Sequence, residues 1–169
     1  MYSELFSRII WFIVLCVVQA LVLNHIHLFG FAIPLLYVYF VMLFRRNTPR
    51  WVILLWSFLL GLFIDTFSNT PGVAAASTTA LGAAQPFLLN LFLPRDSAED
   101  LKPGMGTLGV SSFVYYTLIC VFFYCLLFFS LEAFNFFNWQ RWLECIGGST
   151  VLTVILIVVL EIVRGGKEE

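Results

Sequence analysis

The chain has 169 residues, of which 61% are hydrophobic and 11% are charged, with a net charge of -1. Soluble domains of this size are about 45–50% apolar and about 25% charged, so this composition excludes an ordinary water-soluble domain. We expect an integral membrane protein whose residues 1–169 form a single polytopic transmembrane domain, with no room for a separate soluble domain.

The apolar residues fall into six segments, which predict an all-α membrane protein with six transmembrane helices in a single bundle. A helix needs roughly 17–25 residues to cross the hydrocarbon core, where backbone groups must be satisfied internally. The second and third segments are at the short end of this range. The expected spans are about 5–23, 29–44, 51–67, 73–93, 110–131 and 146–163.

Basic residues are concentrated on one side of this arrangement. The stretches RRNTPR, PRDSAEDLKPG and RGGKEE, together with Arg8, place eight of the nine Lys and Arg residues on that side. Only Arg141 lies on the other side. Because Lys and Arg mark cytoplasmic loops, we expect both chain termini in the cytoplasm.

The stretch GLFIDTFSNTPG places a carboxylate near the end of an apolar helix. Asp65 is the only acidic residue well inside a predicted span. Inserting such a charge costs about 2.5–3.5 kcal/mol at the bilayer centre, so an intramembrane carboxylate is by default a candidate for a functional role.

A structural role for Asp65 is the alternative, and the two roles are compatible. Ser68, Asn69 and Thr70 supply nearby donors, the next helix directs its first N–H groups toward the turn, and Pro71 suits a first helical turn. If Asp65 only braces this hairpin through hydrogen bonds, we expect Asp65→Asn to be nearly neutral and Asp65→Leu to be harmful.

The segment that follows is unusually rich in small residues. From residue 72 to 84 the sequence reads GVAAASTTALGAA. Small side chains let membrane helices approach closely, so we expect Ala76 and Gly82 to lie in tight contact with the bundle or with a partner. Gln85 and Pro86 then bend or loosen this helix near its end.

The sequence gives no sign of catalysis or metal binding. It contains no G-x-S-x-G, H-E-x-x-H or P-loop motif, so we do not expect an enzyme. His25 and His27 are too few for a metal site, and the four cysteines form no CxxC pair. We expect no catalytic residue, metal or cofactor, and Glu161 and Arg164 are expected to form an ion pair at the end of the last span.

The block GLFIDTFSNTPGVAAASTTALG resembles the signature of the rod shape-determining protein MreD family. That family has a Gly-Leu pair, an Asp three positions later, a Ser three further on, and then a Gly and a helix rich in small residues. The matching positions are Gly61, Leu62, Asp65, Ser68, Gly72 and Gly82. The chain length, the six expected spans, the cytoplasmic termini and the basic inner loop agree with the same family.

This resemblance implies a non-enzymatic scaffold of the bacterial cell-elongation machinery in the cytoplasmic (inner) membrane. The implied partner is the bitopic protein MreC and, through it, MreB, RodA and the elongation penicillin-binding transpeptidase; no nucleic acid is implied. The family is also similar in fold to the S components of energy-coupling-factor transporters. The alternative function is therefore a small-molecule-binding component of a membrane transporter.

The expected topology is open to a direct test. Reporter fusions after Arg50, Lys102 and Glu169 should report the cytoplasm, and fusions near Asn69 and Asn138 should report the outside. A cytoplasmic signal at Asn138 would contradict the six-span arrangement.

Overall fold

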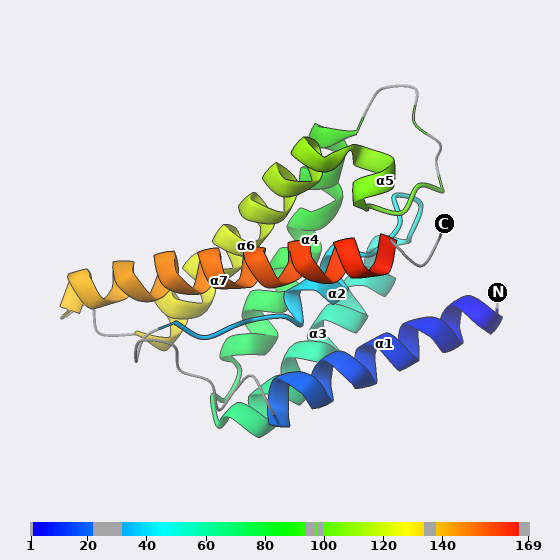
Figure 1. Cartoon of the computed structure of the whole chain (residues 1–169). Helices are drawn as coiled ribbons and strands as arrows, with labels where there is room; N and C mark the ends of the chain where they lie inside the picture. The colour runs from blue at the N-terminus through cyan, green and yellow to red at the C-terminus, as the bar shows by residue number, and fades with distance from the viewer. Residues whose placement is uncertain (1, 22–31, 94–96, 98–99, 134–137, 166–169) are drawn as a thin grey trace.

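Helices make up most of the described chain in the computed structural model (Figure 1). The structure describes residues 2–21, 32–93, 97, 100–133 and 138–165, so the loop with His25 and His27 lies outside the described residues. The helices are α1 (Tyr2–Leu21), α2 (Val38–Met42), α3 (Arg50–Ser68), α4 (Val73–Phe92), α5 (Met105–Leu108), α6 (Val110–Glu132) and α7 (Trp139–Gly165).

Three of these helices, α3, α6 and α7, are long and apolar enough to cross a membrane. The apolar part of α1 is shorter and covers Phe6–Leu21. The helices predicted at 51–67, 73–93 and 110–131 begin and end within about one residue of α3, α4 and α6. The last predicted span, 146–163, lies inside α7, which begins seven residues earlier at Trp139.

The prediction of a continuous helix over residues 29–44 is wrong for the residues described there. Residues 32–35 are not helical, residues 36–37 form a turn, and only the five residues of α2 are α-helical. Pro34 disfavours a helix at this point, because proline has no backbone N–H and disfavours the helical conformation of the residue before it. Hydropathy identified an apolar, buried segment but could not determine its backbone conformation.

Polar side chains from two other helices satisfy the backbone of this irregular segment. The amide of Ile33 donates to the hydroxyl of Ser149 on α7 at 3.1 Å. The amide of Leu35 donates to the hydroxyl of Thr153, also on α7, at 3.1 Å. On α1, Gln19 accepts from the amide of Leu36 at 3.2 Å. Gln19 also donates to the carbonyl of Pro34 at 2.9 Å. Irregular backbone at membrane depth requires such partners, because no water is available there.

The other end of the segment is held in the same way. Gln85 on α4 donates to the carbonyl of Phe44 at 3.1 Å. The hydroxyl of Tyr116 on α6 lies 3.5 Å from the carbonyl of Met42 and 3.4 Å from the Gln85 amide nitrogen. Residues 33–44 are therefore held by polar side chains of α1, α4, α6 and α7.

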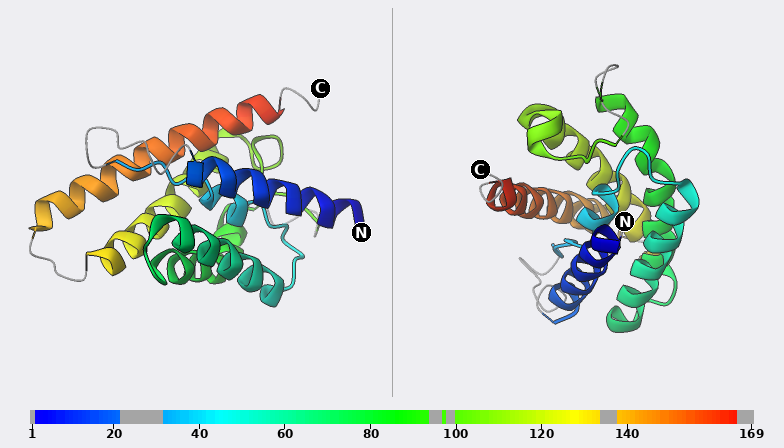
Figure 2. Two further views of the ribbon diagram at one scale, coloured as in Figure 1. Left: turned by 90° about the horizontal axis from the view of Figure 1, so that it is seen from below. Right: turned by 90° about the vertical axis from the view of Figure 1, so that its right-hand side faces the viewer.

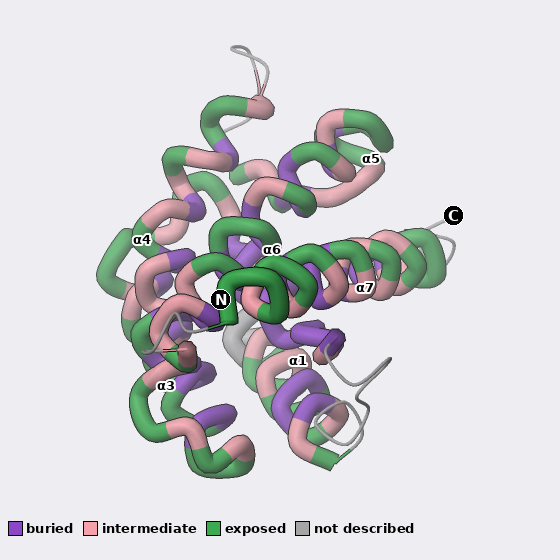
Figure 3. The backbone as a smooth tube through the Cα atoms, turned by 90° about the vertical axis from the view of Figure 1, so that its left-hand side faces the viewer, coloured by how far each residue is buried: buried purple, intermediate pink, exposed green. Residues whose placement is uncertain are grey.

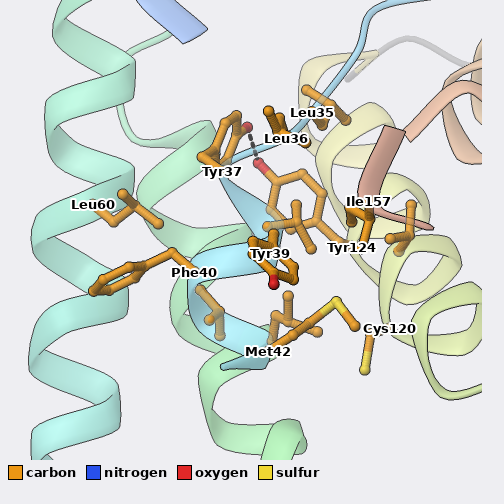
Figure 4. Close-up of a cluster of buried hydrophobic side chains, with 14 of the residues drawn as sticks. Leu35, Leu36, Tyr37, Tyr39, Phe40, Met42, Leu60, Cys120, Tyr124 and Ile157 are labelled. Carbon is orange, nitrogen blue, oxygen red and sulfur yellow. Dashed lines mark hydrogen bonds between the residues drawn. The ribbon is translucent and has the colours of Figure 1, made fainter. Parts of the chain in front are cut away.

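All five residues of α2 are buried, and α2 lies between the longer helices in both views of Figure 2. Figure 3 shows that buried residues of the surrounding helices face inward, with exposed residues outside. In Figure 4, Phe40 is directed toward Leu60 of α3, while Tyr37 shares a hydroxyl hydrogen bond with Tyr124 of α6. The apolar core is thus arranged around the segment that the bundle encloses.

The start of α1 and the end of α7 lie at the same end of the molecule (Figure 1). The connection between α2 and α3 also contacts the connection between α4 and α5. Arg45 pairs with Asp100 at 2.7 Å, and Arg46 donates to Ser97 Oγ at 3.1 Å. The backbone of Arg46 also donates to the carbonyl of Leu101 at 3.3 Å.

The hydroxyl of Thr153 provides a test of how the irregular segment is held. Thr153→Val keeps the shape of the side chain but leaves the buried amide of Leu35 without its acceptor, so it should lower the free energy of unfolding by about 1–3 kcal/mol. Thr117→Val is the matched control, since Thr117 is equally buried and its hydroxyl has no hydrogen-bond partner in the described part of the chain. Thermal unfolding in detergent should separate the two, and equal effects would contradict this role.

Candidate functional site

The carboxylate of Asp65 lies at the N-terminus of the next helix. Its Oδ1 accepts from the amide of Ala74 at 2.8 Å and from the hydroxyl of Thr70 at 3.0 Å. Its Oδ2 accepts from the amide of Ala75 at 2.9 Å. Asp65 is 6% exposed, so it belongs to α3 but caps α4 from inside the protein.

This cap replaces one that α4 lacks within its own sequence. The N-cap of α4 is Gly72, which has no side chain to accept from the first amides. A carboxylate near a helix N-terminus satisfies free N–H groups and interacts favourably with the helix dipole. Asp65 therefore couples the end of α3 to the beginning of α4, which is the bracing geometry considered from the sequence.

The turn between the two helices depends on two residues with positive φ. Asn69 ends α3 with φ 55° and ψ 34°, and its amide donates to the carbonyl of Asp65. Gly72 has φ 85°, a conformation that glycine adopts without the strain of a Cβ. Pro71 lies in this turn and outside α4, so its expected place in the first helical turn is wrong. Ser68 is the last residue of α3.

Two glycines allow α3 and α4 to pack closely. A Cβ on Gly61 would overlap the hydroxyl of Thr78 and the backbone of Ala75. A Cβ on Gly82 would lie 2.5 Å from the hydroxyl oxygen of Ser57. The hydroxyl of Thr78 also donates across this contact to the carbonyl of Ser57 at 2.8 Å. Small residues and hydroxyl hydrogen bonds are the usual means of close helix packing in membranes.

Leu62 and Ala76, the two remaining candidate residues, face away from the contact between α3 and α4. Leu62 is 49% exposed, and Ala76 is also exposed. Within the chain, the expectation of tight packing is therefore met at Gly82 and not at Ala76. The small residues that α4 buries include Ala74, Ala75 and Thr78.

A second buried carboxylate, Glu161, lies on α7. It forms the expected pair with Arg164, at 3.7 Å. The sequence did not indicate its other partners: the hydroxyl of Tyr39 donates to Glu161, and so does the amide of Met105, at 3.4 Å. The hydroxyl of Tyr39 also accepts from Arg164 at 3.0 Å. Glu161 thus links Tyr39 of the buried helix α2 to the end of α7 and the start of α5.

Both carboxylates therefore serve as acceptors in the fold. Asp65 accepts two amides and a hydroxyl, and Glu161 accepts a hydroxyl and an amide, so each is held by neighbouring donors. In the part of the chain that the structure describes, no group of three His, Cys, Asp or Glu residues is placed to hold a metal ion. The hydrogen bonds of both carboxylates hold helices in position.

The geometry of Asp65 changes the expected effect of its substitution. Asparagine has only one acceptor oxygen, so its amide group would direct a donor at one of the two amides that Asp65 now accepts. Asp65→Asn should therefore cost about 1–3 kcal/mol of unfolding free energy and not be nearly neutral. Asp65→Leu should cost more, because both amides and the Thr70 hydroxyl lose their acceptor.

Thr70→Val is the graded control, because it removes one of the three hydrogen bonds and should cost about 1 kcal/mol. Thermal unfolding of the purified variants in detergent should rank them native, Thr70→Val, Asp65→Asn and Asp65→Leu from most to least stable. Native stability of Asp65→Asn would contradict the two-oxygen cap.

Comparison of the chain with models of known protein families, with curated proteins and with solved structures gives no match.

Proposed function

We propose that the chain is a non-enzymatic scaffold of the MreD type in the bacterial cytoplasmic membrane. In this proposal six segments cross the bilayer, the second as the irregular segment 32–44, and both termini face the cytoplasm. The observation that carries the proposal is the α3–α4 hairpin, whose two helices are joined by Asp65 and packed through Gly61 and Gly82. Such a hairpin can present a defined surface to a partner without itself changing shape.

The use of the buried polar groups supports a scaffold. Gln19, Gln85, Ser149 and Thr153 are buried, and each makes a hydrogen bond to the backbone of residues 33–44. Groups engaged in this way hold the bundle together and leave its outer surface for recognition. On that surface, exposed small residues such as Ala76 let a second transmembrane helix approach closely.

The proposed partner is MreC, whose single transmembrane helix would pack against the hairpin. The six residues that carry the resemblance to the MreD family all lie in α3, in α4 or in the turn between them. Through MreC, the complex would support MreB, RodA and the elongation penicillin-binding transpeptidase in side-wall peptidoglycan synthesis and rod shape.

A small-molecule-binding component of a transporter is the second candidate. The irregular segment favours it, because transporters commonly place broken helices at their binding sites. Against it, the backbone of this segment is already engaged by protein side chains at Ile33, Leu35 and Leu36. Mass spectrometry of small molecules extracted from the purified chain distinguishes the two functions, since only the transport component should retain a stoichiometric ligand.

Substitution of Ala76 tests the proposed docking surface. Ala76→Leu adds a bulky side chain at an exposed position of α4, so it should leave the fold stable but reduce co-purification of MreC about tenfold or more. Rod shape should be lost in cells in which this variant replaces the native chain.

Two other substitutions serve as controls. Gly147→Leu makes a comparable change at an exposed position of α7, where an added Cβ meets no atom within 4 Å, and should leave MreC binding intact. Gly82→Leu should destabilise the chain itself by separating α3 from α4. Normal MreC binding and normal cell shape with Ala76→Leu would rule out this surface as the docking site.

A further inference from the structure

A cavity of about 160 Å³ lies where the start of α1, the end of α2 and the end of α7 meet. On the same scale a water molecule needs roughly 10–15 Å³, so the cavity is large enough for a polar group of several heavy atoms. Its lining residues are Ser7, Arg8, Trp11, Phe40, Leu43, Phe44, Arg45, Lys102 and Arg164.

Four of these residues are cations that come from four separate parts of the sequence: Arg8, Arg45, Lys102 and Arg164. Among the described residues, Asp100 lies 2.7 Å from Arg45 and Glu161 lies 3.7 Å from Arg164. Counted over these described residues alone, four cations and two carboxylates leave an excess of two positive charges around the cavity. A ligand with one or two negative charges would balance this excess.

Apart from Ser7, the remaining lining is apolar or aromatic. The guanidinium of Arg8 lies over the ring of Phe44, with 5.5 Å to the ring centroid, so the ring helps to hold one of the cations in place. Trp11 and Phe40 complete an apolar wall. Exposed apolar residues follow along α1, with Ile9 at 41% and Ile13 at 53% exposure. Charge and apolar surface thus lie close together on one helix.

We propose that this cavity binds the phosphate headgroup of an acidic phospholipid, with the acyl chains lying along the exposed side of α1. Basic cavities between membrane helices at the cytoplasmic surface are suited to anionic headgroups. A lipid fits better than a soluble phosphate compound, because the cavity combines cations with an apolar wall at the end of apolar helices. The site is separate from the α3–α4 hairpin and does not depend on the proposed scaffold function.

Lipid titration of the purified full-length chain, followed by native mass spectrometry, tests this site. Phosphatidylglycerol should bind more tightly than phosphatidylcholine with the same acyl chains. The double variant Arg8→Gln with Lys102→Gln should lose about 25-fold in phosphatidylglycerol affinity, since each basic residue near a membrane surface contributes about fivefold. Its affinity for phosphatidylcholine should not change.

The control is Arg50→Gln with Arg141→Gln, which removes the same charge from positions outside the cavity lining and should retain phosphatidylglycerol binding. If the first double variant does not fold, Lys102→Gln alone decides, because Lys102 is exposed. Equal affinity for the two lipids, or unchanged binding after the cavity substitutions, would overturn the proposal. Complete displacement of phosphatidylglycerol by millimolar glycerol phosphate would assign the site to a soluble phosphate compound and overturn the lipid assignment.

Discussion

Backbone groups buried away from water must find partners within the protein, and residues 33–36 impose this requirement on the whole bundle. Their partners are the side chains of Gln19, Ser149 and Thr153, which come from the first and last helices. Unsatisfied amides in an apolar interior cost several kcal/mol each. The positions of α1 and α7 relative to the central segment are therefore set by directional hydrogen bonds as well as by apolar packing.

The α3–α4 hairpin is stabilised in a different and more local way. Asp65 accepts the first amides of α4 at sequence separations of only 9 and 10 residues, and the two glycines remove the side chains that would keep the helices apart. Its geometry thus depends mainly on its own sequence. The bundle combines one locally determined unit with a central segment whose conformation depends on distant residues.

The sequence predicts the structure of the α3–α4 hairpin better than that of the central segment. Hydropathy and the SNTPG break located α3, α4 and α6 closely, and the lone carboxylate pointed to the hairpin cap. The sequence did not show that each carboxylate oxygen of Asp65 accepts an amide, so it did not indicate that Asp65→Asn would remove a needed acceptor. The conformation of residues 32–37 was missed, although Pro34 argued against a helix there. Isolated polar residues in apolar segments, such as Gln19 and Gln85, were the available signal for buried hydrogen bonds, but their partners lie far away in the sequence.

The distance in sequence between the irregular segment and α7 has a consequence for biosynthesis. Ile33 and Leu35 find their acceptors 116 and 118 residues later. At about 5–20 residues per second, the ribosome needs roughly 6–24 s to make the intervening chain. The hairpin can close as soon as α4 emerges, whereas the amides of Ile33 and Leu35 need temporary partners, such as water, lipid headgroups or the insertion machinery, until the last helix arrives. Completion of the core is therefore a late event in the synthesis of this chain.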